Sequence, residues 1–271
     1  AILNVTPDSF SDGGRLPTLE SAIAAGLAAA ACGAAVVDVG GESTRPRGST
    51  YGAGAGDVSS DEELRRVVPV IAGLRAASSS LPISVDTRKA EVAEAALAAG
   101  ADIVNVVTGL EPEPRLLEFV ARRRAAIILN HCRGTPSSTF EVSRFDDVVA
   151  EVARDLALAS RRAQAAGISA RQILLDPGLG FGKKAEQNIA LLLGLARLAS
   201  TEAPLTIGAS RKAFLTSTGG RTGRTIPPEE RLPESLAAAA LAANHGREHA
   251  VLLRVHDVDE TVRFLRILAL A

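Results

Sequence analysis

Short apolar runs and longer amphipathic segments alternate along the whole of this 271-residue chain. Each run has the length and composition of a buried strand, and a polar or glycine-rich connector follows it. The chain therefore consists of repeated strand and helix units. The eight candidate strands cover residues 1–5, 35–39, 82–85, 102–106, 125–129, 172–175, 205–208 and 250–254.

The segments between these runs repeat apolar residues at helical spacing. Helices are predicted over residues 19–31, 61–77, 90–98, 145–166, 185–198 and 229–244. Strict alternation predicts a parallel sheet covered by helices, and eight units favour a closed (β/α)₈ TIM barrel over an open sheet. No linker divides the chain, so one barrel domain over residues 1–271 is expected. The chemistry of such a barrel lies at the C-terminal ends of its strands.

Composition narrows the classes of partner and compartment. With 46% hydrophobic residues the chain can bury a large core, and a net charge of −1 gives no bulk attraction to nucleic acid or to an anionic membrane. Two cysteines, Cys32 and Cys132, predict neither a disulfide framework nor a zinc site. No signal-like start or bilayer-length apolar segment is present, so a soluble, cytoplasmic protein is expected. The absence of Met, even at position 1, suggests a trimmed or excised chain.

The connectors after the first two strands are rich in turn-forming residues. Residues 4–14 include Phe10 and suit either a lid or a capped turn, and the loop itself does not decide between them. Residues 38–48 place Arg45 and Arg47 in a glycine-rich stretch, where an Arg side chain suits a phosphate or carboxylate. For residues 49–60, a solvated loop is the simpler interpretation.

Carboxylates follow the third and the sixth predicted strands. Asp86 comes directly before Thr87 and Arg88, so a helix cap competes with a role in a site. For Asp176 the cap is the weaker alternative, because Pro177 and several glycines delay the next helix. The glycines start after Asp-Pro and do not form a dinucleotide-binding fingerprint.

Polar or charged residues also end or follow the fourth, fifth, seventh and eighth predicted strands. They are Asn105, Asn130 with His131, Ser210 with Arg211 and Lys212, and Arg254 with His256 and Asp257. Each alone is weak evidence, because a single His or Lys is usually structural or solvated. Together they suit a nitrogen heterocycle, bound by acids and an amide, next to an anion bound by cations. The chain contains no Walker A, HExxH or GxSxG sequence.

Two of these stretches, residues 2–14 and 37–46, resemble the signature segments of the dihydropteroate synthases. Residues 84–88, Asn105 and residues 131–136, 175–178, 210–212 and 254–257 continue the resemblance in family order across nearly the whole chain. The resemblance implies that 4-aminobenzoate displaces pyrophosphate from a 7,8-dihydropterin, with Mg²⁺ assisting and sulfonamides competing. It also implies a homodimer.

The resemblance implies a role for each matching residue. Asp86, Lys212 and Arg254 would be catalytic, and the pterin pocket would consist of Asp86, Asn105, Asp176 and Lys212. Arg254, His256 and Asn4 would hold pyrophosphate, with Asn4 also reaching Mg²⁺. Thr44 and Arg45 would close over the site, and Phe10 and Pro46 would wall the aminobenzoate slot. Many relatives carry a serine at the position of Ala213 to meet the aminobenzoate carboxylate, and here Ser210 would take that role.

The sequence departs from the family pattern at a few positions. Val106 stands where the family usually has Asp, and Asn130 and Cys132 flank His131 where Met is common. These changes leave a catalytically silent pterin-binding relative as one alternative. A barrel of the corrinoid methyltransferase type is another, although it gives no reason for two anion-binding arginine loops.

Overall fold

The computed structural model describes residues 1–5, 18–42, 58–135, 138–198, 203–217, 226–245 and 250–270, and in these ranges the strands form one parallel sheet. The sheet runs in chain order: β1 (Ile2–Asn4), β2 (Val37–Gly40), β3 (Ile83–Asp86), β4 (Ile103–Val106), β5 (Ala126–Asn130), β6 (Ile173–Asp176), β7 (Leu205–Ile207) and β8 (Val251–Leu253). The backbone N–H of Ile2 donates to the carbonyl of Val255 at 2.8 Å, so β1 meets the chain just after β8. The sheet is therefore curled into the predicted (β/α)₈ barrel.

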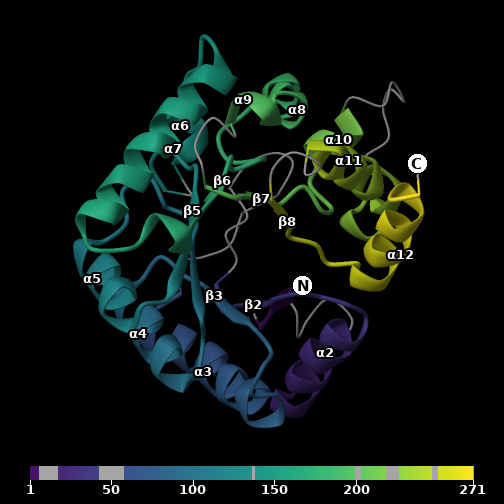
Figure 1. Ribbon diagram of the computed structural model, residues 1–271. Helices are drawn as coiled ribbons and strands as arrows, with labels where there is room; N and C mark the ends of the chain where they lie inside the picture. Colours follow the sequence, from purple (N-terminus) through teal and green to yellow (C-terminus); the bar gives the residue numbers. More distant parts are fainter. Residues whose placement is uncertain are drawn as a thin grey trace.

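Helices surround the strands on the outside (Figure 1). They are α2 (Leu19–Ala31), α3 (Ser60–Ala77), α4 (Ala90–Ala99), α5 (Pro114–Arg123), α6 (Thr139–Val142), α7 (Val148–Ala165), α8 (Ala185–Leu193), α9 (Leu195–Leu198), α10 (Phe214–Ser217), α11 (Leu232–His245) and α12 (Val258–Leu268). Within the described ranges, no helix is both long and apolar enough to cross a membrane.

The predicted helix over residues 19–31 has the observed bounds, and other predicted helices differ at their ends for local reasons. The helix predicted from residue 145 begins at Val148, because the carboxylate of Asp147 accepts hydrogen bonds from the first free N–H groups. The segment 185–198 is divided at Gly194, and the segment 229–244 begins only after a 3₁₀ turn at Pro228–Glu230. Helices α5 and α12 were not among the predicted segments.

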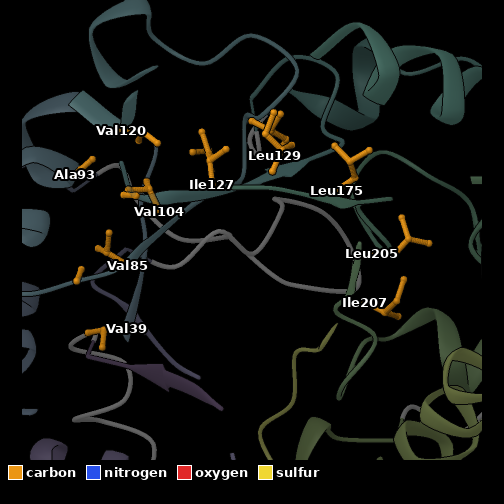
Figure 2. Close-up of a cluster of buried hydrophobic side chains, with 14 of the residues drawn as sticks. Val39, Val85, Ala93, Val104, Val120, Ile127, Leu129, Leu175, Leu205 and Ile207 are labelled. Atoms are coloured by element: carbon orange, nitrogen blue, oxygen red, sulfur yellow. The ribbon is translucent and has the colours of Figure 1, made fainter. Parts of the chain in front are cut away.

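Alternate residues of each strand point outward and form the main apolar core with the helices. Figure 2 shows this layer, in which the labelled strand side chains follow one another along the sheet. Ala93 of α4 and Val120 of α5 pack from the outside. The strand residues labelled there are Val39, Val85, Val104, Ile127, Leu129, Leu175, Leu205 and Ile207. Because side chains alternate along a strand, the residues between them face the interior of the barrel.

The register of the sheet brings the inward polar residues side by side. Gly40 pairs with Asp86, and Asp86 with Asn105, across β2, β3 and β4. On the other side of the barrel Asn130 pairs with Asp176. The ends of these strands therefore gather acids and amides around a common centre.

Candidate active site

Arg254, directly after β8, lies at the centre of this polar group. Its Nε donates to Oδ2 of Asp38 at 2.5 Å, and its Nη2 donates to Oδ2 of Asp86 at 2.6 Å. The side-chain amide of Asn105 also donates to Oδ2 of Asp38, at 3.2 Å. One guanidinium thus joins acids from β2 and β3 across the barrel. The cap alternative for Asp86 is wrong, because α4 begins at Ala90 and the carboxylate binds Arg254.

Burial and neighbouring charges shift the pKa values of this group. Burial raises the pKa of Asp86 to about 7, although the positive charge of Arg254 opposes the shift. Burial by itself would lower the pKa of Arg254, but Asp38 and Asp86 more than reverse this and raise it. Arg254 therefore stays charged, whereas Asp86 changes its protonation state near neutral pH.

Asp176 and Lys212 form the second part of the site. The carboxylate of Asp176 accepts a hydrogen bond from the backbone N–H of Gly178 at 2.7 Å, which fixes its orientation. The ammonium of Lys212 donates to the carbonyl of Leu179, and its Nζ lies 4.7 Å from the centre of the Phe181 ring. Both residues therefore contact the glycine-rich loop that follows β6.

The two parts of the site lie within electrostatic reach of each other. Burial lowers the pKa of Lys212 to about 8, and the negative charges of Asp176 and Asp86 partly oppose this shift. Burial also raises the pKa of Asp176, although the charge of Lys212 opposes it. The structure thus brings Asp86, Asp176, Lys212 and Arg254 together instead of scattering them over the barrel.

Several buried polar atoms have no hydrogen-bond partner within the described part of the chain, and three of them are oxygens of inward-facing acid or amide side chains on the strands. These three are Oδ1 of Asp38, Oδ1 of Asp86 and Oδ1 of Asn130. An unsatisfied buried acceptor is costly, so native proteins rarely keep one without a reason. A ligand that presents several N–H donors would satisfy this set.

Asn4, at the end of β1, faces the same centre from the other side. A Cβ placed on Gly40 would lie 3.7 Å from Oδ1 of Asn4 and 3.8 Å from Oδ2 of Asp86. The missing side chain of Gly40 therefore leaves room between an amide oxygen and a carboxylate oxygen. No group of three or more His, Cys, Asp or Glu side chains in the described ranges could hold a metal ion by itself.

Ser210 and His256 come together where β7 and β8 end. Oγ of Ser210 lies 3.0 Å from Nδ1 of His256 and also accepts from the His256 backbone N–H at 3.2 Å. Arg211 makes a two-point ion pair with Asp257. The backbone of Arg211 has a φ of 60°, a left-handed conformation that residues other than glycine seldom adopt. The pair joins the two loops and holds the backbone directly before Lys212.

Lys89 joins both ends of the connection between β2 and α3. Its Nζ donates to Oε2 of Glu42 at 2.9 Å and to the carbonyl of Val58 at 2.7 Å. It also donates to the buried Glu63 of α3 at 2.5 Å.

Four of the predicted site residues, Phe10, Thr44, Arg45 and Pro46, lie outside the described residues.

The departures from the family pattern are accommodated by packing. Val106 lies in the apolar core, and Cys132 packs with Val107 and Phe181 in a small cluster of its own. Ala213 is buried.

Sequence reasoning missed two residues that shape this site. Asp38 was not selected, although it is two positions before Gly40 and so shares its inward face. Lys183 was also missed, and it lies buried at the end of the loop that follows β6. Strand periodicity alone contained the signal for Asp38, whereas nothing in the sequence distinguishes Lys183 from its exposed neighbour Lys184.

Comparison with known proteins agrees with this geometry. The family model described as "Pterin binding enzyme" matches residues 1–256. The dihydropteroate synthase of Escherichia coli K12 is 43% identical over 266 residues, which are 98% of this chain and 88% of the relative. A solved Xanthomonas albilineans dihydropteroate synthase with 4-aminobenzoic acid has a TM-score of 0.86 and 46% identity, covering 100% of this chain and 91% of that one.

A Yersinia pestis dihydropteroate synthase in complex with a sulfonamide drug is similar to the same degree. Its TM-score is 0.87 at 40% identity, with 100% of this chain and 92% of that chain covered. Matches of this extent cover the barrel and all the strand ends described above. The chain belongs to the dihydropteroate synthase family of pterin-binding enzymes.

Proposed function

We propose that this chain condenses 6-hydroxymethyl-7,8-dihydropterin pyrophosphate with 4-aminobenzoate to give 7,8-dihydropteroate and pyrophosphate. The observation that carries the proposal is the set of unsatisfied acceptors on Asp38, Asp86 and Asn130 beside the cations Lys212 and Arg254. Acceptors suit the N–H groups of a pterin ring, and cations suit its pyrophosphate. Membership of the family supports the same reaction.

Asp176 and Lys212 would hold the pterin ring. A carboxylate can accept from a ring N–H and an exocyclic amine, while an ammonium donates to a ring oxygen or nitrogen. The Gly178 N–H holds Asp176 in place for this purpose. Asn105, which is anchored to Asp38, would complete the pocket.

Asp86 would act as an electrostatic catalyst. The amine nitrogen of 4-aminobenzoate forms a bond to the pterin methylene carbon while the bond from that carbon to the pyrophosphate oxygen breaks. Positive charge spreads into the pterin as the leaving group departs, and a fixed carboxylate stabilises it. The extra proton on the attacking nitrogen is then lost to solvent.

Arg254, His256 and Asn4 would form the pyrophosphate end of the site. The guanidinium of Arg254 has five N–H donors, so it can hold Asp38 and Asp86 and still donate to an anion. Mg²⁺ would neutralise charge on the departing pyrophosphate. The side-chain oxygen of Asn4, which lies beside Gly40, would reach this ion, which takes few protein ligands and keeps several waters.

The aminobenzoate end of the site rests on the family resemblance. Phe10, Thr44, Arg45 and Pro46 would form it, and Lys89 supports this assignment by fixing both ends of the segment that carries the last three. Ser210 would contribute through its contact with His256. We place the enzyme in the cytoplasm, as a single barrel domain that forms a homodimer.

Release of pyrophosphate is the direct test of this function. Purified chain, given the dihydropterin pyrophosphate, 4-aminobenzoate and Mg²⁺, should release pyrophosphate in amounts equal to the dihydropteroate formed. Omitting 4-aminobenzoate should abolish the signal, and a sulfonamide should compete with it. A folded barrel that binds pterin but releases no pyrophosphate would favour the silent relative instead.

Replacing Lys212 with Ala should weaken pterin binding by about tenfold to a hundredfold, the usual value of a hydrogen bond to a charged group. The lowered pKa of Lys212 indicates that burying its ammonium is unfavourable. Removing the ammonium should therefore leave the fold intact. Isothermal titration with 6-hydroxymethylpterin measures the effect, and the exposed Lys184→Ala variant is the control. Unchanged affinity in Lys212→Ala would remove Lys212 from the pterin pocket.

A further inference from the structure

Lys183 directly follows the glycine-rich loop after β6, and this residue is only 3% exposed. Its Nζ lies 2.9 Å from the carbonyl of Gly178, 3.0 Å from that of Phe181 and 3.1 Å from Nδ1 of His131. These acceptors are neutral, and no carboxylate pairs with Lys183 within the described ranges. A buried cation held by loop carbonyls calls for an explanation beyond a surface charge.

The same loop also contacts the proposed pterin ligands. The N–H of Gly178 donates to Asp176, and the carbonyl of Leu179 accepts from Lys212. Gly178 has a φ of 66°, and a Cβ there would lie 1.9 Å from the His131 carbonyl. The loop is therefore held closely by His131 and Lys183, and it also contacts the two ligand-binding side chains.

His131 fixes Lys183 from the end of β5. Its ring is fully buried, and its Nε2 lies 3.3 Å from Oδ2 of Asp155, which also accepts from Arg133. Burial lowers the pKa of His131 to about 4, so the ring is neutral at neutral pH. The hydrogen bond from His131 lowers the pKa of Asp155 to about 2. We therefore assign the ring proton to Nε2, which leaves Nδ1 to accept from Lys183.

From this arrangement we infer that Lys183 is a positioning residue for the pterin site. It holds the β6 loop so that the Gly178 N–H orients Asp176 and the Leu179 carbonyl orients Lys212. The inference rests on the proposed role of these two side chains as pterin ligands. Lys183 does not act on the substrate itself, because its ammonium is taken up by the carbonyls of Gly178 and Phe181 and by the His131 ring.

The protonation state of Lys183 should couple to pterin binding. Burial lowers the pKa of Lys183 to about 7, so the amine loses a donor just above neutral pH. Several groups set this value: the charges of Arg133 and Lys212 lower it, and Cys132 and Asp176 raise it. If the protonated amine holds the loop in its binding form, pterin binding must raise the pKa of Lys183 by linkage.

The first test compares the neighbouring variants Lys183→Met and Lys184→Met. Methionine keeps most of the buried stem but removes every N–H donor. By analogy with other residues that orient a ligand set, 6-hydroxymethylpterin should bind about tenfold or more weakly to Lys183→Met. Lys184 is exposed at the start of α8, so the Lys184→Met variant should bind the pterin as tightly as the wild type does.

A second measurement uses the wild-type protein and therefore does not depend on the variant folding. The chain has only four lysines, Lys89, Lys183, Lys184 and Lys212, so ¹³Cε-lysine labelling gives signals that single variants assign. The Lys183 signal should titrate near neutral pH, and saturation with 6-hydroxymethylpterin should raise its midpoint. A purely structural lysine would titrate at the same pH with and without pterin.

The outcomes separate this inference from the proposed function. Failure of wild-type protein to bind the pterin would overturn both. Suppose that the wild type binds the pterin and that Lys212→Ala weakens this binding. If Lys183→Met then binds pterin as well as the wild type, or if the pterin does not raise the titration midpoint of Lys183, the positioning role alone is overturned. Weaker binding in Lys183→Met together with a raised midpoint supports it.

Discussion

Replacing Asp86 with Asn is expected to lower turnover by about a hundredfold or more, the usual loss when one preorganised electrostatic group is removed. The amide has the shape of the carboxylate and can still accept from Arg254, but it provides no charge to set against the cation that develops on the pterin. Because burial raises the pKa of Asp86 to about 7, the fold disfavours the ionised form. The melting temperature of the variant should therefore equal or exceed that of the wild type.

The dependence of activity on pH gives an independent check of this role. The ionised carboxylate is the active form, so kcat/KM for the pterin substrate should fall as the pH drops below about 7. The Asp86→Asn variant should lose this acid limb together with its activity. Steady-state pyrophosphate release over a pH series measures both effects. The exposed Asp259→Asn variant on α12 is the control, and wild-type turnover in Asp86→Asn would refute the assignment.

The fold could be predicted well from the sequence because each unit follows a local rule. Apolar runs separated by amphipathic segments specify strands and helices wherever turn formers mark the ends. The errors came from local chemistry at helix ends. Asp147 caps α7 two residues inside the predicted helix, and Gly194 divides the segment that was expected to be continuous.

The site was predicted only in part, because the sequence shows which residues follow a strand but not what they contact. Asp86, Asp176, Lys212 and Arg254 were noted from their positions at or after strand ends, and their roles were assigned from the family resemblance. The carboxylate of Asp38 was missed, because its importance comes from a contact with Arg254, 216 positions further along the chain. Lys183 was missed for a similar reason, since its partner His131 directly follows β5, 52 positions earlier in the chain.

Arg254 is the residue whose loss should have the largest combined effect on stability and binding. Arg254→Met leaves the buried carboxylates of Asp38 and Asp86 without their shared cation, and breaking such a contact typically costs about 3–5 kcal/mol of stability. Without Arg254 the pKa of Asp86 should rise further above about 7. Its protonation then relieves the penalty, so the stability of the variant should improve as the pH falls and worsen as it rises.

A compensated variant separates this scaffold effect from the binding of the anion. Arg254→Met combined with Asp38→Asn removes one carboxylate together with the cation, so it should recover much of the lost stability. It should still bind pyrophosphate far more weakly than the wild type, because the guanidinium donors are gone. Chemical denaturation at two pH values and calorimetric titration with Mg²⁺-pyrophosphate measure the two effects. Recovery of pyrophosphate binding along with stability would show that Arg254 only neutralises the two acids and does not hold the leaving group.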